Sequence, residues 1–173
     1  MYRPPTITPT DVERFLKEDD LIVSKTDTAS RITYASESFC EIAGYTYEEL
    51  RGKPHCIIRH PCMPRAVFSL MWEHLKQEKE FLGYVKNMSS DGSFYWTFAS
   101  IAPTYDKGEV VGYMSSRRAP TREALSTIEP IYQRMREAEM QLSPDQQIPA
   151  SSALLWQEIS REYQSYAEYI LSL

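Results

Sequence analysis

The spacing of apolar residues along the chain predicts two short strands first, short helices next and three longer strands last. Apolar runs at 21–23 and 32–34 flank a polar, turn-like segment, and this pattern predicts a β-hairpin. Three later segments alternate apolar and polar positions and are separated by turns that contain glycine; they lie at 81–87, 94–104 and 109–116. Such segments are typical of an antiparallel meander, so we expect a five-stranded antiparallel sheet in total.

Capping residues and helical spacing fill the part of the chain between the two groups of strands. Residues 36–44 begin with a candidate N-cap serine and end with glycine, and residues 46–52 begin with a capping box and also end with glycine. The stretch 53–64 holds three prolines, so no long regular element is expected there. An amphipathic helix then runs to about residue 79. The chain from 19 to 119 is therefore predicted to be one α+β domain.

Helical segments are expected on both sides of this domain. Residues 1–18 are interpreted as an unstructured lead followed by a short amphipathic helix. After the domain, a charged helix at 120–142 carries an apolar stripe that Pro130 should kink. A polar linker is expected at 143–152, and a last amphipathic helix is expected at 153–173. An amphipathic helix of this kind needs a partner surface, either on the same domain or on a second copy.

Composition and charge exclude several classes of function. The net charge is −5, and Lys and Arg gather nowhere into a basic face, which argues against a nucleic-acid partner. The sequence has no apolar run near the ~18–20 residues that cross a bilayer, and its start has no signal-peptide core. We therefore expect a cytoplasmic protein without membrane insertion. The 3 cysteines form no CxxC pair and are expected to be free thiols.

Candidate chemical groups gather in a stretch rich in histidine and cysteine. No GxSxG, HExxH, Walker or GxGxxG motif is present in the sequence, so we do not expect an enzyme. His55, Cys56, His60 and Cys62 could supply zinc ligands, but their spacing fits no common structural zinc pattern. A haem needs one neutral imidazole as axial ligand, which His55, His60 or His74 could supply.

A ligand pocket is better supported by the same stretch. Arg59 and His60 stand beside Pro61 on an irregular loop, where they could direct donors at an electron-rich heterocycle or a phosphate. Aromatic residues on the following helix and strands could sandwich a flat ring. The candidates for this role are Trp72, Phe81, Tyr95 and Trp96.

Several strings of residues resemble one family. ITYASESF, GYTYEEL, GKPHCIIRHPCMP, MWEHL, YVKN, DGSFYW and GYMSSRRAPT are similar to the PAS domain of aerotaxis (energy taxis) receptors, over about residues 21–131. The resemblance implies a PAS fold that holds FAD non-covalently between its central helices and its sheet. It further implies a sensor of redox or oxygen status that signals to a chemotaxis transducer by protein contact.

The same resemblance implies a set of cofactor-binding positions. Three of them carry a different residue here: the acidic residue after RHP is Cys62, the pocket tryptophan is Phe81, and the asparagine after the second strand is Ser36. A cysteine or serine replaces neither the charge nor the reach of the family residue. The full expected set is Arg59, His60, Phe68, Trp72, Phe81, Asn87, Tyr95, Ser36 and Cys62.

Other interpretations remain open at the level of sequence. A haem b gas sensor on the same fold and a cofactor-free PAS module that mediates dimers are the alternatives, with a flavoenzyme less favoured. A receptor or transducer protein is the expected partner, and a homodimer is expected. Aerotaxis receptors continue into membrane and coiled-coil regions, so this chain resembles a stand-alone PAS protein of a bipartite energy-taxis system or a part of a longer receptor.

Overall fold

The computed structural model describes residues 7–17 and 19–173 of the chain. Its centre is a five-stranded antiparallel sheet with the strand order β2-β1-β5-β4-β3. The fold class and the predicted meander are confirmed, since β3, β4 and β5 pair in sequence order. The strands are β1 (Ile22–Asp27), β2 (Ile32–Ala35), β3 (Phe81–Met88), β4 (Phe94–Asp106) and β5 (Glu109–Arg118).

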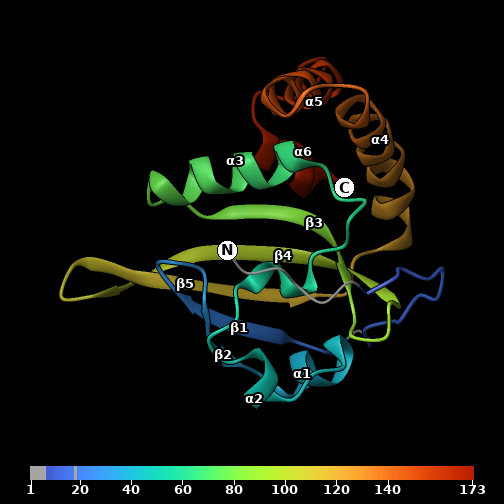
Figure 1. Ribbon diagram of the computed structural model, residues 1–173. Coiled ribbons are helices and arrows are strands. Elements are labelled where there is room, and N and C mark those ends of the chain that lie inside the picture. Colours follow the sequence, from blue (N-terminus) through green and yellow to red (C-terminus); the bar gives the residue numbers. More distant parts are fainter. Residues whose placement is uncertain (1–6, 18) are drawn as a thin grey trace.

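Helices cover the sheet in two groups (Figure 1). The first group lies beside β1 and β2, and α3 runs along β3; the second group stacks against α3 at the β3 side of the sheet. The first group consists of α1 (Glu37–Ala43), α2 (Tyr47–Leu50) and the 3-10 helix η1 (His55–Ile58). Helix α3 (Arg65–Lys76) follows them in the chain. The second group consists of α4 (Arg122–Met140), α5 (Pro144–Ile159) and α6 (Tyr166–Ser172).

Local capping explains why the two short helices α1 and α2 form. The Ser36 hydroxyl accepts the Phe39 N–H at the start of α1, and Gly44 ends that helix with a φ of 70°. Thr46 and Glu49 cap each other at the start of α2, as the sequence predicts. These short elements hold η1 and the loop after it against the sheet.

Two separate apolar clusters fill the interior. The smaller cluster joins α1, α2 and η1 to β1 and β2 through residues such as Phe39 and Ile58. The larger cluster joins α3 and the C-terminal helices to β3 and β4 through residues such as Val67, Phe81 and Met135. The space between the clusters is where the candidate site lies.

A buried carboxylate ties the C-terminal helices to α3. Glu139 on α4 is 0% exposed, and its Oε1 accepts the backbone N–H groups of Arg65 at 2.7 Å and Ala66 at 3.3 Å. The Ser151 hydroxyl on α5 donates to the same oxygen at 2.7 Å, and Arg136 pairs with the other oxygen at 3.3 Å. Because Pro64 offers no side-chain cap, Glu139 supplies the cap of α3 from another helix.

The N-terminal segment departs from the sequence prediction. The helix expected near residues 10–16 does not form, and the backbone instead runs beside the turn between β3 and β4. Phe94 N–H donates to the Val12 carbonyl at 2.9 Å and Arg14 N–H donates to the Phe94 carbonyl at 2.7 Å. These bonds satisfy the backbone in an extended form, so the helical spacing of apolar residues is overridden. The first six residues of the expected lead, and residue 18, lie outside the described residues.

The C-terminal segment also departs from the prediction. The expected linker at 143–152 is mostly helix, because Ser143 precedes Pro144 at the first position of α5, where a missing N–H costs nothing. The single helix expected at 153–173 is two helices, broken between Ile159 and Tyr166. Pro130 lies inside α4 without ending it.

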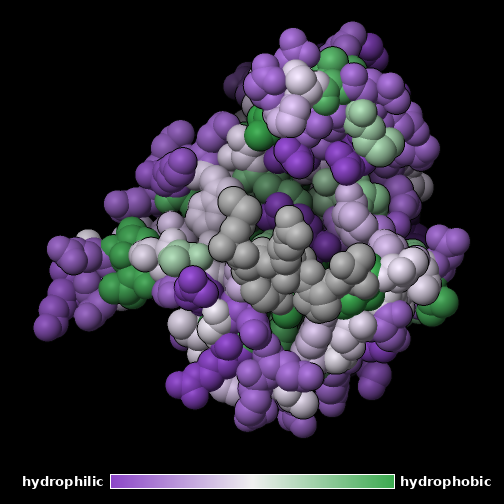
Figure 2. All heavy atoms as spheres, in the orientation of Figure 1, coloured by the Kyte–Doolittle hydropathy of each residue, from purple (hydrophilic) through white to green (hydrophobic). Residues whose placement is uncertain are grey.

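The visible surface of the C-terminal helices is mostly hydrophilic, whereas a hydrophobic group marks the projecting β4–β5 hairpin (Figure 2). Val111 on this hairpin is 48% exposed. Along the described ranges, no helix is both long enough and apolar enough to span a bilayer.

Candidate functional site

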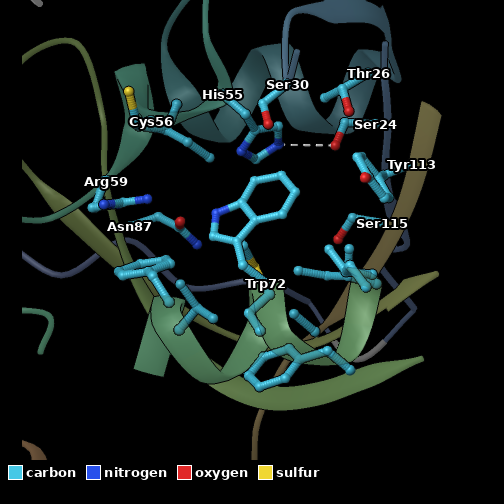
Figure 3. A pocket seen from close by; sticks show the side chains of 18 of the residues that line it. Ser24, Thr26, Ser30, His55, Cys56, Arg59, Trp72, Asn87, Tyr113 and Ser115 are labelled. Atoms are coloured by element: carbon cyan, nitrogen blue, oxygen red, sulfur yellow. Dashed lines mark hydrogen bonds between the residues drawn. The ribbon is translucent and has the colours of Figure 1, made fainter. Parts of the chain in front are cut away.

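A cavity of about 270 Å³ lies between the sheet and the helices η1 and α3. Small-molecule sites usually measure ~300–1,000 Å³, so the volume of this cavity is slightly below that range. Strands β1, β3, β4 and β5 form its floor, and η1, the loop after it and α3 form its roof. Figure 3 shows the Trp72 indole in the middle of the view, with polar side chains to both sides of it.

The walls of the cavity are apolar and partly aromatic. Helix α3 presents Val67, Phe68, Met71, Trp72 and Leu75, whose spacing of three and four places them on one face. The sheet presents four more residues from the inward-facing positions of β3 and β4. They are Phe81, Val85, Ala99 and Ile101. Such walls suit a flat apolar ring.

Arg59 and Asn87 lie together on one side of the cavity (Figure 3). The Arg59 guanidinium carbon stands 3.6 Å from the centre of the Phe68 ring, a cation–π contact. The backbone of Arg59 bridges to that of Asn87, which fixes the loop to the edge strand β3. The Asn87 side-chain amide is buried and donates to the Thr97 hydroxyl at 3.3 Å.

A second polar group, His55, Arg117, Ser24 and Ser115, lines the cavity through residues of η1, β5 and β1. Arg117 Nη2 donates to His55 Nε2 at 2.8 Å and to the Ser24 hydroxyl at 3.1 Å. Since a guanidinium only donates, His55 Nε2 is an acceptor and the ring proton lies on Nδ1. Desolvation, with Arg117 and Arg59 nearby, holds the pKa of His55 well below its ordinary range, so this ring is neutral at pH 7.

Arg117 is charged and incompletely satisfied. Burial lowers the pKa of its guanidinium to about 10, which leaves it protonated at pH 7. Its Nη1 has no hydrogen-bond partner among the described residues, and neither has the buried hydroxyl of Ser115 on the same strand. Both residues line the cavity, so these unused donors fit a ligand that carries acceptor atoms.

Comparison with known proteins identifies the family. Residues 32–117 match the family model described as PAS fold. This part of the chain is a PAS domain. The PAS domain is similar to the aerotaxis receptor of Escherichia coli (strain K12), with 42% identity over 117 residues, which are 68% of this chain and 23% of the receptor. The residues that match the family model, 32–117, lie within the predicted domain of 19–119.

Two further comparisons agree with the PAS fold. The nitrogen fixation regulatory protein of Klebsiella pneumoniae is 28% identical over 104 residues, which are 60% of this chain and 21% of that protein. A solved light-oxygen-voltage domain, from work on a flavin analogue, superposes with a TM-score of 0.56 at 21% identity and covers 64% of this chain and 83% of its own. The chain spans less than a quarter of the length of the two curated relatives, at 23% and 21%.

The PAS cavity brings together five of the nine expected cofactor-binding residues. They come from the loop after η1, from α3 and from β3. Asn87 and Phe81 are almost fully buried, at 3% and 1% exposed. Trp72 packs edge-on against Tyr113, with ring centres 5.4 Å apart. The five residues are Arg59, Phe68, Trp72, Phe81 and Asn87.

The other four expected residues do not line the cavity. Ser36 caps α1, and its hydroxyl also accepts the Val23 N–H at 3.0 Å. Tyr95 is 0% exposed within the smaller apolar cluster. His60 and Cys62 lie on the loop before α3, where Cys62 Sγ stands 2.8 Å from His60 Nδ1. In this structure these side chains support the loops and helices around the cavity.

His60 makes a pH dependence of stability testable. Burial, helped by Lys86, lowers the pKa of His60 to about 4 from its ordinary value of 6.5. Below about pH 6.5 the unfolded chain therefore takes up a proton that the folded protein refuses until about pH 4. The free energy of unfolding should fall as the pH drops through this window, by at most about 3 kcal/mol from this group.

Urea unfolding at several pH values measures this contribution. The His60→Gln variant should flatten the loss between about pH 6.5 and pH 4 relative to the parent protein. His55 adds a residual slope in the same direction, because its pKa is also lowered. Parallel curves for parent and variant would contradict the assignment.

The structure gives less support to the metal and haem alternatives. The described residues hold no group of three or more His, Cys, Asp and Glu side chains that could bind a metal ion. Of the three histidines, His55 alone lines the cavity, and its Nε2 already accepts from Arg117. His74 instead contacts the Leu70 carbonyl through Nδ1 at 2.9 Å.

Sequence reasoning missed Arg117, Ser24 and Ser115 as members of the site. Each sits at an inward position of an alternating strand, so strand periodicity carried a signal for the face. Periodicity carried no signal for which residue lies opposite on the neighbouring strand, because Ser24 lies opposite Ser115 only through the register of β1 with β5. Two residues further along the same strands, Arg117 stands opposite Ile22.

Proposed function

We propose that this PAS domain binds FAD in the cavity and acts as a sensor of redox or oxygen status. In this proposal it passes the signal by contact to a chemotaxis receptor or transducer, works in the cytoplasm as a homodimer and is not an enzyme. One observation carries the proposal: an apolar, partly aromatic slot has buried donors on its polar sides. A flavin ring is flat, stacks on aromatic side chains and carries carbonyl and nitrogen acceptors along one edge.

Residues of this chain supply the contacts that such a ring needs. Phe68, Trp72 and Phe81 give apolar surface, and Asn87 and Arg59 give polar contacts beside it. The bound flavin would supply reversible electron transfer, and the protein would position the ring and set its surroundings. Arg59 and Cys56 are exposed, so the cavity is accessible from the loop between η1 and α3. In this proposal the rest of the dinucleotide extends past these two residues, outside the enclosed volume.

The connection from the cavity to the C-terminal helices supports a signalling role. Helix α3 forms the roof of the cavity, and its first N–H groups are bonded to Glu139 of α4. A change of contacts along α3 would therefore act on α4, and through Ser151 on α5. These helices carry the hydrophilic surface seen in Figure 2, on which a partner could read such a change.

An absorption spectrum of the purified protein tests the cofactor. We expect flavin bands near about 375 and 450 nm, bleached by a reductant, after purification or after addition of FAD. The Asn87→Leu variant should retain roughly tenfold less FAD, because it loses a polar contact worth about 1.4 kcal/mol. Thr33→Val, an exposed change on β2, is the control and should keep the parent affinity.

A protein that stays colourless with added FAD would reject the proposal. A Soret band that disappears in a His55→Ala variant would replace FAD with haem. Equal thermal stability with and without FAD would favour a cofactor-free dimerisation module, because a ligand that binds the folded state must stabilise it. Sedimentation at several concentrations measures the expected dimer.

A further inference from the structure

The guanidinium of Arg117 is a buried positive charge that has no acidic partner in the part of the chain that the structure describes. Its side chain is 4% exposed, and the atoms that accept from its Nη2 belong to the neutral groups Ser24 and His55. None of the described residues that line the cavity is Asp or Glu, and the other charged lining residue is Arg59. The interior of this end of the cavity is therefore positively charged.

The contacts of Arg117 with the described residues offset only part of the cost of burying that charge. An unpaired buried ion costs several kcal/mol, while a cation–π contact returns only ~0.5–2 kcal/mol. The Phe39 ring offers such a contact at 5.3 Å. The hydroxyl of Tyr95 cannot compensate as a phenolate, because desolvation raises its pKa above the ordinary value.

Among the described residues, the deeply buried carboxylate of Glu139 is surrounded differently. Glu139 accepts from two backbone N–H groups and from Ser151, and it pairs with Arg136. The buried carboxylate of Glu139, which has a structural role, is thus supplied with both hydrogen-bond donors and a counter-charge. Arg117 keeps Nη1 unused, and Ser115, two residues earlier on the same strand, keeps its hydroxyl unused; both residues line the cavity.

We propose that Arg117, oriented by His55 and Ser24, is the anchor for the electron-rich edge of the ligand. The cavity selects a planar ring whose edge carries carbonyl oxygens or negative charge, and it binds the negatively charged form of that ring more tightly than the neutral form. Ser115 supplies a second donor to the same edge. This inference rests on the proposed binding of FAD and assigns Arg117 as the residue that discriminates between its charge states.

The selection has a defined consequence for FAD. Uptake of two electrons and one proton converts the neutral oxidised ring into a reduced ring with one negative charge. If Arg117 binds the reduced ring more tightly, the midpoint potential of bound FAD lies above that of free FAD. For a two-electron couple, a tenfold difference in affinity corresponds to about 30 mV.

The experiment measures the midpoint potential of bound FAD by titration with dithionite against a reference dye, near neutral pH. In Arg117→Met the preference for the reduced form should fall at least tenfold, a decrease of about 30 mV or more. Arg117→Lys keeps the charge and should keep most of the preference. Arg118→Met removes the exposed neighbouring cation, which stacks on Phe98 outside the cavity, and should leave the potential unchanged.

A second pair of variants covers the case in which Arg117→Met does not fold. Ser115→Asp supplies the missing carboxylate and Ser115→Asn has the same shape without charge. The apo Ser115→Asp protein should be more stable than apo Ser115→Asn, and its bound FAD should have a potential lower by about 30 mV or more. Apo proteins of equal stability would overturn the proposal.

The remaining outcomes separate the two levels of inference. A parent protein that binds no FAD rejects the proposed function and, with it, this assignment. A parent protein that binds FAD, with the same potential in Arg117→Met as in the parent, leaves the cofactor in place and overturns the role of Arg117.

Discussion

Replacing Gly112 with alanine is expected to destabilise the protein by about 3 kcal/mol or more and to widen the cavity. A Cβ atom at this position would stand 1.9 Å from the carbonyl oxygen of Thr26 and 3.0 Å from its carbon. Both atoms belong to the backbone of β1, so no side-chain rotation relieves the overlap. Strand β1 must move away from β5, on which it depends for its register.

The same displacement of β1 changes the cavity, because Thr26 on β1 and Tyr113, the neighbour of Gly112 on β5, both line it. Urea unfolding measures the loss of stability, and a titration with FAD measures the loss of affinity. Val111→Ala is the matched control on the neighbouring, exposed position of β5 and should change stability by less than about 0.5 kcal/mol. A Gly112→Ala protein as stable as this control would contradict the close approach of the Thr26 carbonyl to this position.

Replacing Glu139 with alanine is the second change with a large expected effect, a loss of about 3 kcal/mol. The substitution leaves the buried N–H groups at the start of α3 and the Ser151 hydroxyl without their acceptor. Glu139→Gln keeps the shape and one acceptor oxygen but loses the charge, so it should cost about half as much. Thermal or urea unfolding gives both values.

Glu137→Ala is the control for this pair, since Glu137 lies on the exposed side of α4 and its carboxylate accepts from the Gln133 side chain at 2.9 Å. It should be within about 0.5 kcal/mol of the parent. Hydrogen exchange adds a local test: the amides of Arg65 and Ala66 should lose protection in Glu139→Ala. Unchanged exchange at these amides would contradict the cap described for α3.

Elements with local signals could be predicted from the sequence. The helix from Ser36 to Gly44 has its cap and its stop within nine residues, and the capping box of α2 lies within four. The meander is signalled by alternation and by glycine turns. In these cases the residues that determine the structure are neighbours in sequence, so no knowledge of distant contacts is needed.

The N-terminal and C-terminal segments could not be predicted in this way. Val12 and Phe15 have helical spacing, yet both are exposed, at 62% and 68%, because pairing with the turn between β3 and β4 fixes the backbone. Two prolines near the start of α5 predict a linker from the sequence. The segment is helical nevertheless, because it packs against α3 and α4. Tertiary contacts determined both outcomes.

For the site, family resemblance supplied Arg59, Phe68 and Asn87, and the structure places all three around one cavity. The pairing of Arg117 with His55 and Ser24 joins three segments far apart in the chain. It depends on the register of β1 with β5 and on the placement of η1. A single sequence gives neither quantity, so this part of the site required coordinates.

The three tryptophans differ in their distance from the cavity, and this gives the protein an optical readout. Trp72 lies on the cavity wall, Trp96 packs against Tyr132 among the C-terminal helices, and Trp156 is 40% exposed. A coloured ligand in the cavity would quench the indole of Trp72 first by energy transfer, and that of Trp156 least. When the ligand enters, the remaining fluorescence would come mainly from the exposed indole of Trp156, so the emission maximum would shift toward the red. Occupancy of the cavity can therefore be followed without a label.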